Sequence, residues 1–123
     1  MPVRIIVCGS DRYENRDHVR VALDHVHELR DVRTIILTSS LGVAQFARAW
    51  ARYARAEVIA CSSVAEMFQH QPNGVVAFPG GSHTRATLYA AGRAGIPVYV
   101  APPHGVLHDG YCALMPPPGS NQR

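Results

Sequence analysis

Short apolar segments alternate with amphipathic segments along this chain. The apolar segments are strand-sized, and the first amphipathic segment places Val19, Ala22, Leu23 and Val26 at helical spacing. The pattern predicts strands at Val3–Cys8, Thr34–Thr38, Val58–Cys61, Gly74–Phe78 and Ile96–Ala101. It predicts helices that begin near Asn15 or Asp17, near Val43, at the capping pair Ser63 and Glu66, and at Thr84, the last ending at about Arg93 before Gly95.

Strands that are apolar throughout and alternate with helices predict an α/β fold with a parallel sheet, because helices then cover both faces. We expect a single three-layer, Rossmann-like domain with an open sheet of about five strands over residues 1–101, followed by a proline-rich tail at 102–123. In such sheets, ligands bind beyond the carboxyl ends of the strands, where the strand order reverses. The loops after the first and fourth strands are therefore the candidate site.

The length of 123 residues and the 47% hydrophobic content fit one domain with a buried core. No apolar run is long enough to span a membrane, so we expect a soluble, cytoplasmic protein. Cys8, Cys61 and Cys112 are odd in number and have no C-x-x-C spacing, which argues against a disulfide framework and a zinc knuckle.

All 12 basic residues are arginines, and the formal net charge is +3. The absence of lysine excludes a Walker-type phosphate lysine and a Schiff-base lysine. The arginines are interleaved with acidic residues along the chain, so the sequence does not indicate a nucleic-acid-binding stripe.

The loop after the first strand contains Gly9, Ser10 and Arg12. Glycine permits close approach of a ligand, while the hydroxyl and the guanidinium can contact a phosphate. A tight turn needs glycine for steric reasons alone, and Arg12 can pair with Asp11 at the surface. The ligand-binding and the purely structural interpretation of this loop both stay open.

The segment Pro79–Thr84 follows the fourth strand and joins a glycine pair to hydroxyl residues at a helix start. Backbone N–H groups and the positive end of a helix favour an anion at such a place. Ser82 or Thr84 acting only as an N-cap is the structural alternative. Arg85 lies in the first helical turn, where a cation is unfavourable unless an anion is close.

His83 is the one histidine within the candidate site. His25 and His27 lie two apart on a helix, and His104 and His108 lie in the tail. Neither pair suggests a metal site without distant partners, so we expect no metal. We also expect no other cofactor and assign no catalytic residue.

In this order, the motifs resemble the SLOG superfamily, the Rossmann-like group that contains the LOG phosphoribohydrolases and the YpsA and YspA proteins. Val7–Tyr13 is similar to the YspA-type opening, with Asp11 and Arg12 transposed, and Pro79–Thr84 is similar to the Pro-Gly-Gly-x-Gly-Thr ligand loop. The resemblance runs over Val3–Ala101. It implies a nucleotide-derived ligand whose phosphate lies near Gly80, Gly81 and Thr84, and it implies a homodimer.

Three positions depart from the patterns of these families. LOG enzymes carry a glutamate where this chain has Thr87, and His83 replaces the third glycine of the loop. After the second strand, Thr38–Ala44 stands where YspA-like proteins have Gly-Gly-Ala-Arg-Gly-Ala-Asp, and Ser39 and Ser40 can still donate hydrogen bonds there.

These observations favour non-catalytic binding or sensing of a nucleotide-like small molecule, with neither nucleic acid nor membrane as a partner. The expected ligand contacts are Gly9, Ser10, Arg12, Ser39, Gly80, Gly81, Ser82, His83 and Thr84. One alternative is a LOG-like nucleoside monophosphate phosphoribohydrolase that uses another carboxylate, with Asp11 the nearest. The other is a degenerate domain that acts through protein association at Trp50, Tyr53 or Tyr89.

Overall fold

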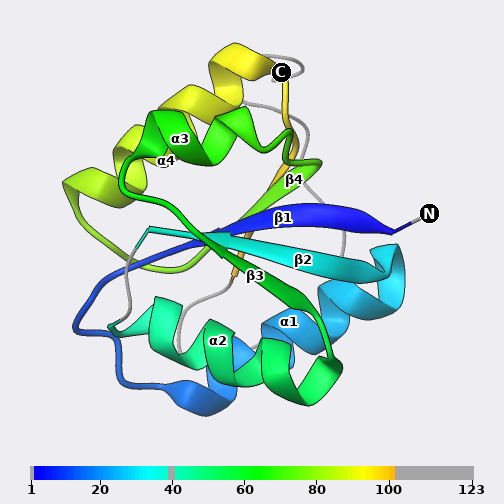
Figure 1. The fold of residues 1–123 in the computed structure, drawn as a ribbon. Helices are drawn as coiled ribbons and strands as arrows, with labels where there is room; N and C mark the ends of the chain where they lie inside the picture. Colours follow the sequence, from blue (N-terminus) through cyan, green and yellow to red (C-terminus); the bar gives the residue numbers. More distant parts are fainter. Residues whose placement is uncertain (1, 39–40, 102–123) are drawn as a thin grey trace.

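A five-stranded, all-parallel sheet forms the centre of the molecule. The computed structural model describes residues 2–38 and 41–101. The elements alternate along the chain as β1 (Val3–Cys8), α1 (Arg16–Arg30), β2 (Val32–Leu37), α2 (Val43–Ala54), β3 (Glu57–Ala60), α3 (Val64–Gln69), β4 (Gly74–Ala77), α4 (Ser82–Ala94) and β5 (Val98–Val100) (Figure 1). The predicted fold class is confirmed.

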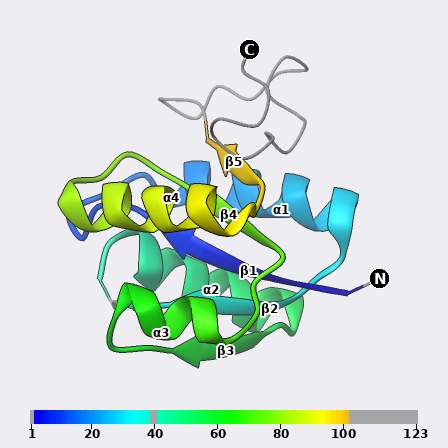
Figure 2. The same ribbon diagram turned by 90° about the horizontal axis from the view of Figure 1, so that it is seen from above.

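The strand order β3-β2-β1-β4-β5 reverses direction between β1 and β4. Helices α1 and α2 cover one face of the sheet, and α3 and α4 cover the other (Figures 1 and 2). Cys8, the last residue of β1, pairs in register with Ala77, the last residue of β4. The loops after these two strands therefore leave the sheet side by side, at the point where open α/β sheets bind ligands.

The pleat of β1 divides the core between the two faces. Ile5 and Val7 pack with the buried residues of α1 and α2, whereas Ile6 and Cys8 pack with Met67 of α3 and residues of α4. Because both faces are covered, the strands need apolar residues at consecutive positions. This explains why the apolar runs were sufficient to locate them.

Trp50 is buried in the core between the sheet and α1, and its Nε1 donates a hydrogen bond to Asp24 Oδ1 at 2.7 Å. Trp50, named above as a possible association residue, is therefore part of the core. Tyr53 and Tyr89 are exposed.

Some expectations fall outside the described residues, namely the tail at 102–123 and the hydrogen-bond donors Ser39 and Ser40. In the part of the chain that the structure describes, no helix has both the length and the hydropathy of a membrane span.

The helix ends follow the predicted signals with one exception. Asn15 Oδ1 accepts a hydrogen bond from the His18 amide, and Gly95 ends α4 in the left-handed conformation (φ 72°). However, α4 begins at Ser82, two residues before the predicted start, and its N-cap is Gly81. The structural alternative, in which Ser82 or Thr84 is the N-cap of this helix, is not observed, because the N-cap is Gly81 and both residues lie inside the first turn.

Gly42, the N-cap of α2, has a conformation that requires glycine. Its φ is +60°, and a Cβ atom there would lie 2.2 Å from the Ser10 carbonyl oxygen. The start of α2 is thus pressed against the loop after β1, and the Val43 amide donates to the same Ser10 carbonyl at 3.2 Å.

We expect Gly42→Ala to lower the free energy of unfolding more than Gly95→Ala. Both residues have positive φ, but a Cβ at Gly95 meets nothing within 4 Å. Backbone strain alone costs about 1 kcal/mol at Gly95, and the added clash costs about 1–3 kcal/mol more at Gly42. Urea denaturation measures both, and equal losses would contradict the close approach of Gly42 to Ser10.

Candidate functional site

The candidate site lies where the loops after β1 and β4 meet at the carboxyl edge of the sheet. The Ser10 amide donates to the Pro79 carbonyl at 2.9 Å, and the Phe78 amide donates to the Cys8 carbonyl at 2.9 Å. These bonds continue the β1–β4 pairing beyond the strands. The two loops predicted from the sequence are therefore neighbours in space.

The glycines of these loops have different roles. A Cβ at Gly9 would lie 2.6 Å from Val43 Cγ2, and a Cβ at Gly80 would lie 2.2 Å from Thr84 Oγ1. At Gly81 a Cβ meets nothing within 4 Å. Glycine is thus required at positions 9 and 80 by packing within the protein, while Gly81 faces open space.

The first turn of α4 carries backbone donors that have no acceptor in the described ranges. The backbone amide of Arg85 donates to the Gly81 carbonyl at 3.0 Å. The amides of Ser82, His83 and Thr84 make no hydrogen bond within the described ranges. Gly81 has no side chain with which to cap them. Ser82 and His83 are exposed, whereas Thr84 is buried, so the first two residues of the helix lie at the surface of the molecule.

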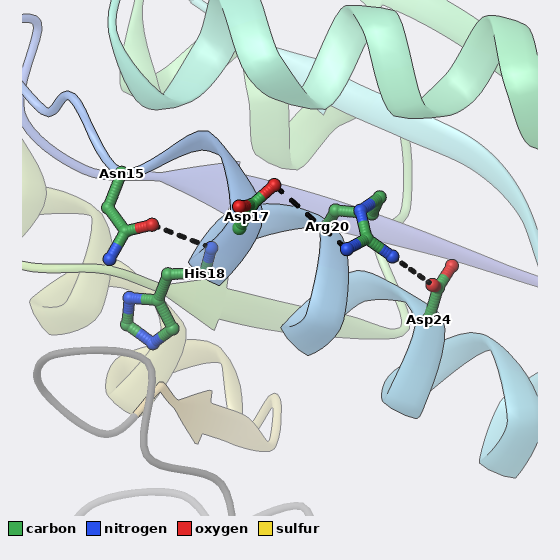
Figure 3. A network of polar contacts seen from close by, with 5 residues as sticks. All are labelled: Asn15, Asp17, His18, Arg20 and Asp24. Carbon is green, nitrogen blue, oxygen red and sulfur yellow. Dashed lines mark hydrogen bonds and ion pairs between the residues drawn. The ribbon is translucent and has the colours of Figure 1, made fainter.

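Each other helix start in the described ranges has an internal acceptor. Asn15 Oδ1 caps α1 and Ser63 Oγ caps α3, while the Ser10 carbonyl accepts from the first amide of α2. In the first turns of α1, Arg20 also lies between two carboxylates, 3.9 Å from Asp17 and 3.7 Å from Asp24 (Figure 3). The start of α4 is therefore the place among these helices where an anion finds uncommitted amides.

The hydroxyl residues of α4 are not equivalent. Ser82 is exposed, whereas Thr84 is 5% exposed and its buried Oγ1 has no hydrogen-bond partner among residues 2–38 and 41–101. Thr87 is fully buried, and its Oγ1 donates to the His83 carbonyl at 3.0 Å. Thr87 stands at the position of the LOG glutamate, so this position offers no carboxylate to a ligand.

His83 connects the start of α4 to the end of the second strand. Its Nε2 lies 3.0 Å from Thr38 Oγ1, the residue that follows β2. Because β1 lies between β2 and β4, this hydrogen bond passes over the carboxyl end of β1. No local sequence pattern indicates this contact, since 45 residues separate its partners.

Arg12 lies on the α2 side of the same edge. It lines an open cleft of about 390 Å³ together with Tyr13, Leu41 and Phe46. Its amide donates to Ser10 Oγ at 3.0 Å, which leaves the Ser10 hydroxyl proton for another acceptor. Its guanidinium forms no ion pair among residues 2–38 and 41–101, and no described contact joins it to Gly80–Thr84.

Cys8 lies beneath this edge at the end of β1. Burial raises the pKa of its thiol to about 12, so the thiol is protonated at neutral pH and is not a nucleophile.

Comparison with known families identifies the family of the first half of the chain. The model of the YspA, cpYpsA-related SLOG family matches residues 3–66, which is 64 of the 123 residues. The chain belongs to this SLOG family. The match runs from β1 into α3, so the SLOG resemblance proposed for Val3–Ala101 is supported over that part and the loop at Pro79–Thr84 lies beyond it. Searches of curated proteins and of solved structures gave no match.

We expect Thr84→Val to make the ligand-free protein more stable than Thr87→Val does. Replacing a buried hydroxyl that has no partner by a methyl group gains about 1 kcal/mol, whereas Thr87→Val loses an existing hydrogen bond. Chemical denaturation of the two variants measures the difference. If Thr84→Val were the less stable variant, the Thr84 hydroxyl would have a partner in solution.

Proposed function

We propose that this SLOG protein binds a nucleotide-derived, phosphate-bearing small molecule without transforming it, with the phosphate at the start of α4. The observation that carries the proposal is the set of uncommitted amides at Ser82, His83 and Thr84. Peptide dipoles add a positive potential at this point, and SLOG proteins have a nucleotide-ligand-binding fold.

The surroundings of these amides support a ligand that extends along the edge of the sheet. The bond between Ser10 and Pro79 joins the loops after β1 and β4, so a phosphate at Ser82 also lies close to the Ser10 loop. Arg12 and Arg85 are exposed cations without ion pairs in the described ranges, and an anion would compensate the unfavourable position of Arg85 near a helix start. Phe46 and Tyr13 offer apolar surface for a base in the neighbouring cleft.

The chemistry at α4 supports binding rather than hydrolysis. Cleavage of an N-glycosidic bond requires a carboxylate near the developing positive charge. The position that carries this group in LOG enzymes is Thr87, whose hydroxyl is bonded to the His83 carbonyl. Asp11, the carboxylate that the sequence suggests instead, lines the cleft of Arg12.

We expect Gly81→Val to abolish nucleotide binding while the protein stays folded. A Cβ atom at Gly81 meets nothing within 4 Å, so the change adds bulk on the open side of the loop, where it obstructs the approach to the amides. In thermal shift assays with a panel of nucleoside mono- and diphosphates, a ligand at 100 times its Kd should raise the Tm of the parent protein by roughly 10 °C. The variant should show no shift.

Ala94→Val is the matched control, because Ala94 is exposed at the far end of α4. It should keep the full shift. Retained binding in Gly81→Val would contradict the proposed phosphate position, and release of free base from any bound nucleotide would contradict the non-catalytic role.

We expect Arg12→Ala to weaken a nucleotide but not the corresponding uncharged nucleoside. Loss of a charge-assisted contact to phosphate raises the Kd roughly 10- to 100-fold. Isothermal titration calorimetry measures both ligands, with Arg93→Ala as the control because Arg93 lies in the last turn of α4. Equal losses for nucleotide and nucleoside would refute the role of Arg12.

A further inference from the structure

Three side chains of different chemistry meet beside α3, at the carboxyl end of β3. Cys61 directly follows β3, Glu66 lies in the first turn of α3, and His70 is its C-cap. The Cys61 Sγ atom, a Glu66 carboxylate oxygen and a His70 ring nitrogen all lie within 4.8 Å of one another. Glu66 and His70 are four residues apart and so lie on one side of the helical turn.

Backbone contacts fix the positions of these residues. The Cys61 amide donates to the Leu37 carbonyl at 2.7 Å, which extends the β2–β3 pairing, and the His70 amide donates to the Met67 carbonyl at 3.2 Å. Glu66 Oε1 accepts hydrogen bonds from the amide and the hydroxyl of Ser62, at 2.8 and 2.7 Å. Its second oxygen, Oε2, makes no hydrogen bond within the described residues.

Helix capping explains the position of Glu66 but not the rest of the cluster. The Ser63 hydroxyl accepts from the Glu66 amide, and the Glu66 carboxylate accepts from Ser62, which together complete the start of α3. Neither bond requires a thiol or an imidazole. The approach of Cys61 and His70 to this carboxylate is a separate feature, and it assembles the three donor types that zinc binds.

We propose that Cys61, Glu66 and His70 bind a divalent transition metal ion of the Zn²⁺ class, with a fourth coordination position open to water or another ligand. Tetrahedral zinc holds neighbouring sulfur and nitrogen donors about 3.5 Å apart, so side-chain rotations that close the cluster by about 1 Å are sufficient. The mixture of thiolate and imidazole favours Zn²⁺ or Co²⁺ over Mg²⁺ and Ca²⁺.

Binding at this site exchanges a proton for the metal. Burial, and secondarily the Glu66 carboxylate, raise the pKa of the Cys61 thiol, so the metal-free residue is protonated at neutral pH. The metal displaces this proton and forms a thiolate bond. One thiolate and one carboxylate then balance the charge of the divalent ion.

The direct test is a titration of the full-length, chelator-treated chain with Co²⁺, followed by absorption spectroscopy. We expect one Co²⁺ per chain, visible bands of a tetrahedral site, and a near-ultraviolet thiolate-to-cobalt charge-transfer band that Zn²⁺ abolishes by displacement. Cys61→Ser should lose this band, while Cys8→Ser and Cys112→Ser should retain it.

Two further variants test the other ligands. Glu66→Gln keeps an oxygen acceptor for Ser62, and His70→Gln keeps a polar side chain at the C-cap. Each should weaken Co²⁺ binding by at least roughly tenfold. Metal-free circular dichroism spectra show whether each variant is folded.

Alkylation of the unmodified protein provides a test that needs no variant. Zn²⁺ should protect Cys61 from iodoacetamide, as mapped by peptide mass spectrometry. The proposal is overturned if the parent protein shows no charge-transfer band, if the band survives in Cys61→Ser, or if Co²⁺ binds without any thiolate signal.

Discussion

Three backbone N–H groups at the start of α4 have no acceptor among the described residues, and the fold holds them at the edge where its parallel strands end. A serine, threonine, asparagine or aspartate at the N-cap normally satisfies one such donor, and a glycine in its place costs roughly a few tenths of a kcal/mol. Gly81 offers no side chain for this purpose. An anion supplies acceptors to several donors at once and meets the positive end of the helix dipole. The proposed function follows from this one unsatisfied helix start.

Contacts from two other strands hold this helix start in position. The Ser10–Pro79 bond ties the loop after β1 to the loop after β4, and the His83–Thr38 bond reaches over β1 to the end of β2. Gly80 packs directly on Thr84, so a side chain at this position would push the loop away from the helix. Gly80 therefore permits close packing on the helix, and Gly81 leaves the helix start open to a ligand.

The sequence was sufficient for the fold because its strands are buried on both faces and its helices carry strong end signals such as Asn15, Ser63 and Gly95. It also located the two loops of the site, because parallel strands place their carboxyl ends together.

The sequence analysis failed at the start of α4, where Ser82 and Thr84 have the residue types of caps but lie inside the helix. The burial of Thr84 and the contact of His83 with Thr38 arise from tertiary packing, which no local pattern encodes. The sequence analysis did not find the cluster of Cys61, Glu66 and His70, because it considered only C-x-x-C spacing and pairs of histidines. The pattern that corresponds to the cluster is Cys-x4-Glu-x3-His.

The most direct test of the central claim is a two-dimensional ¹H–¹⁵N NMR titration of the protein with a nucleoside monophosphate that raises its Tm. If phosphate binds at the start of α4, the largest shift changes should occur at the amides of Ser82, His83 and Thr84, with their protons moving downfield as they donate to the anion. The same amides should respond to inorganic phosphate. Shift changes confined to the cleft of Arg12, Leu41 and Phe46, with the amides of residues 82–84 unaffected, would contradict the account.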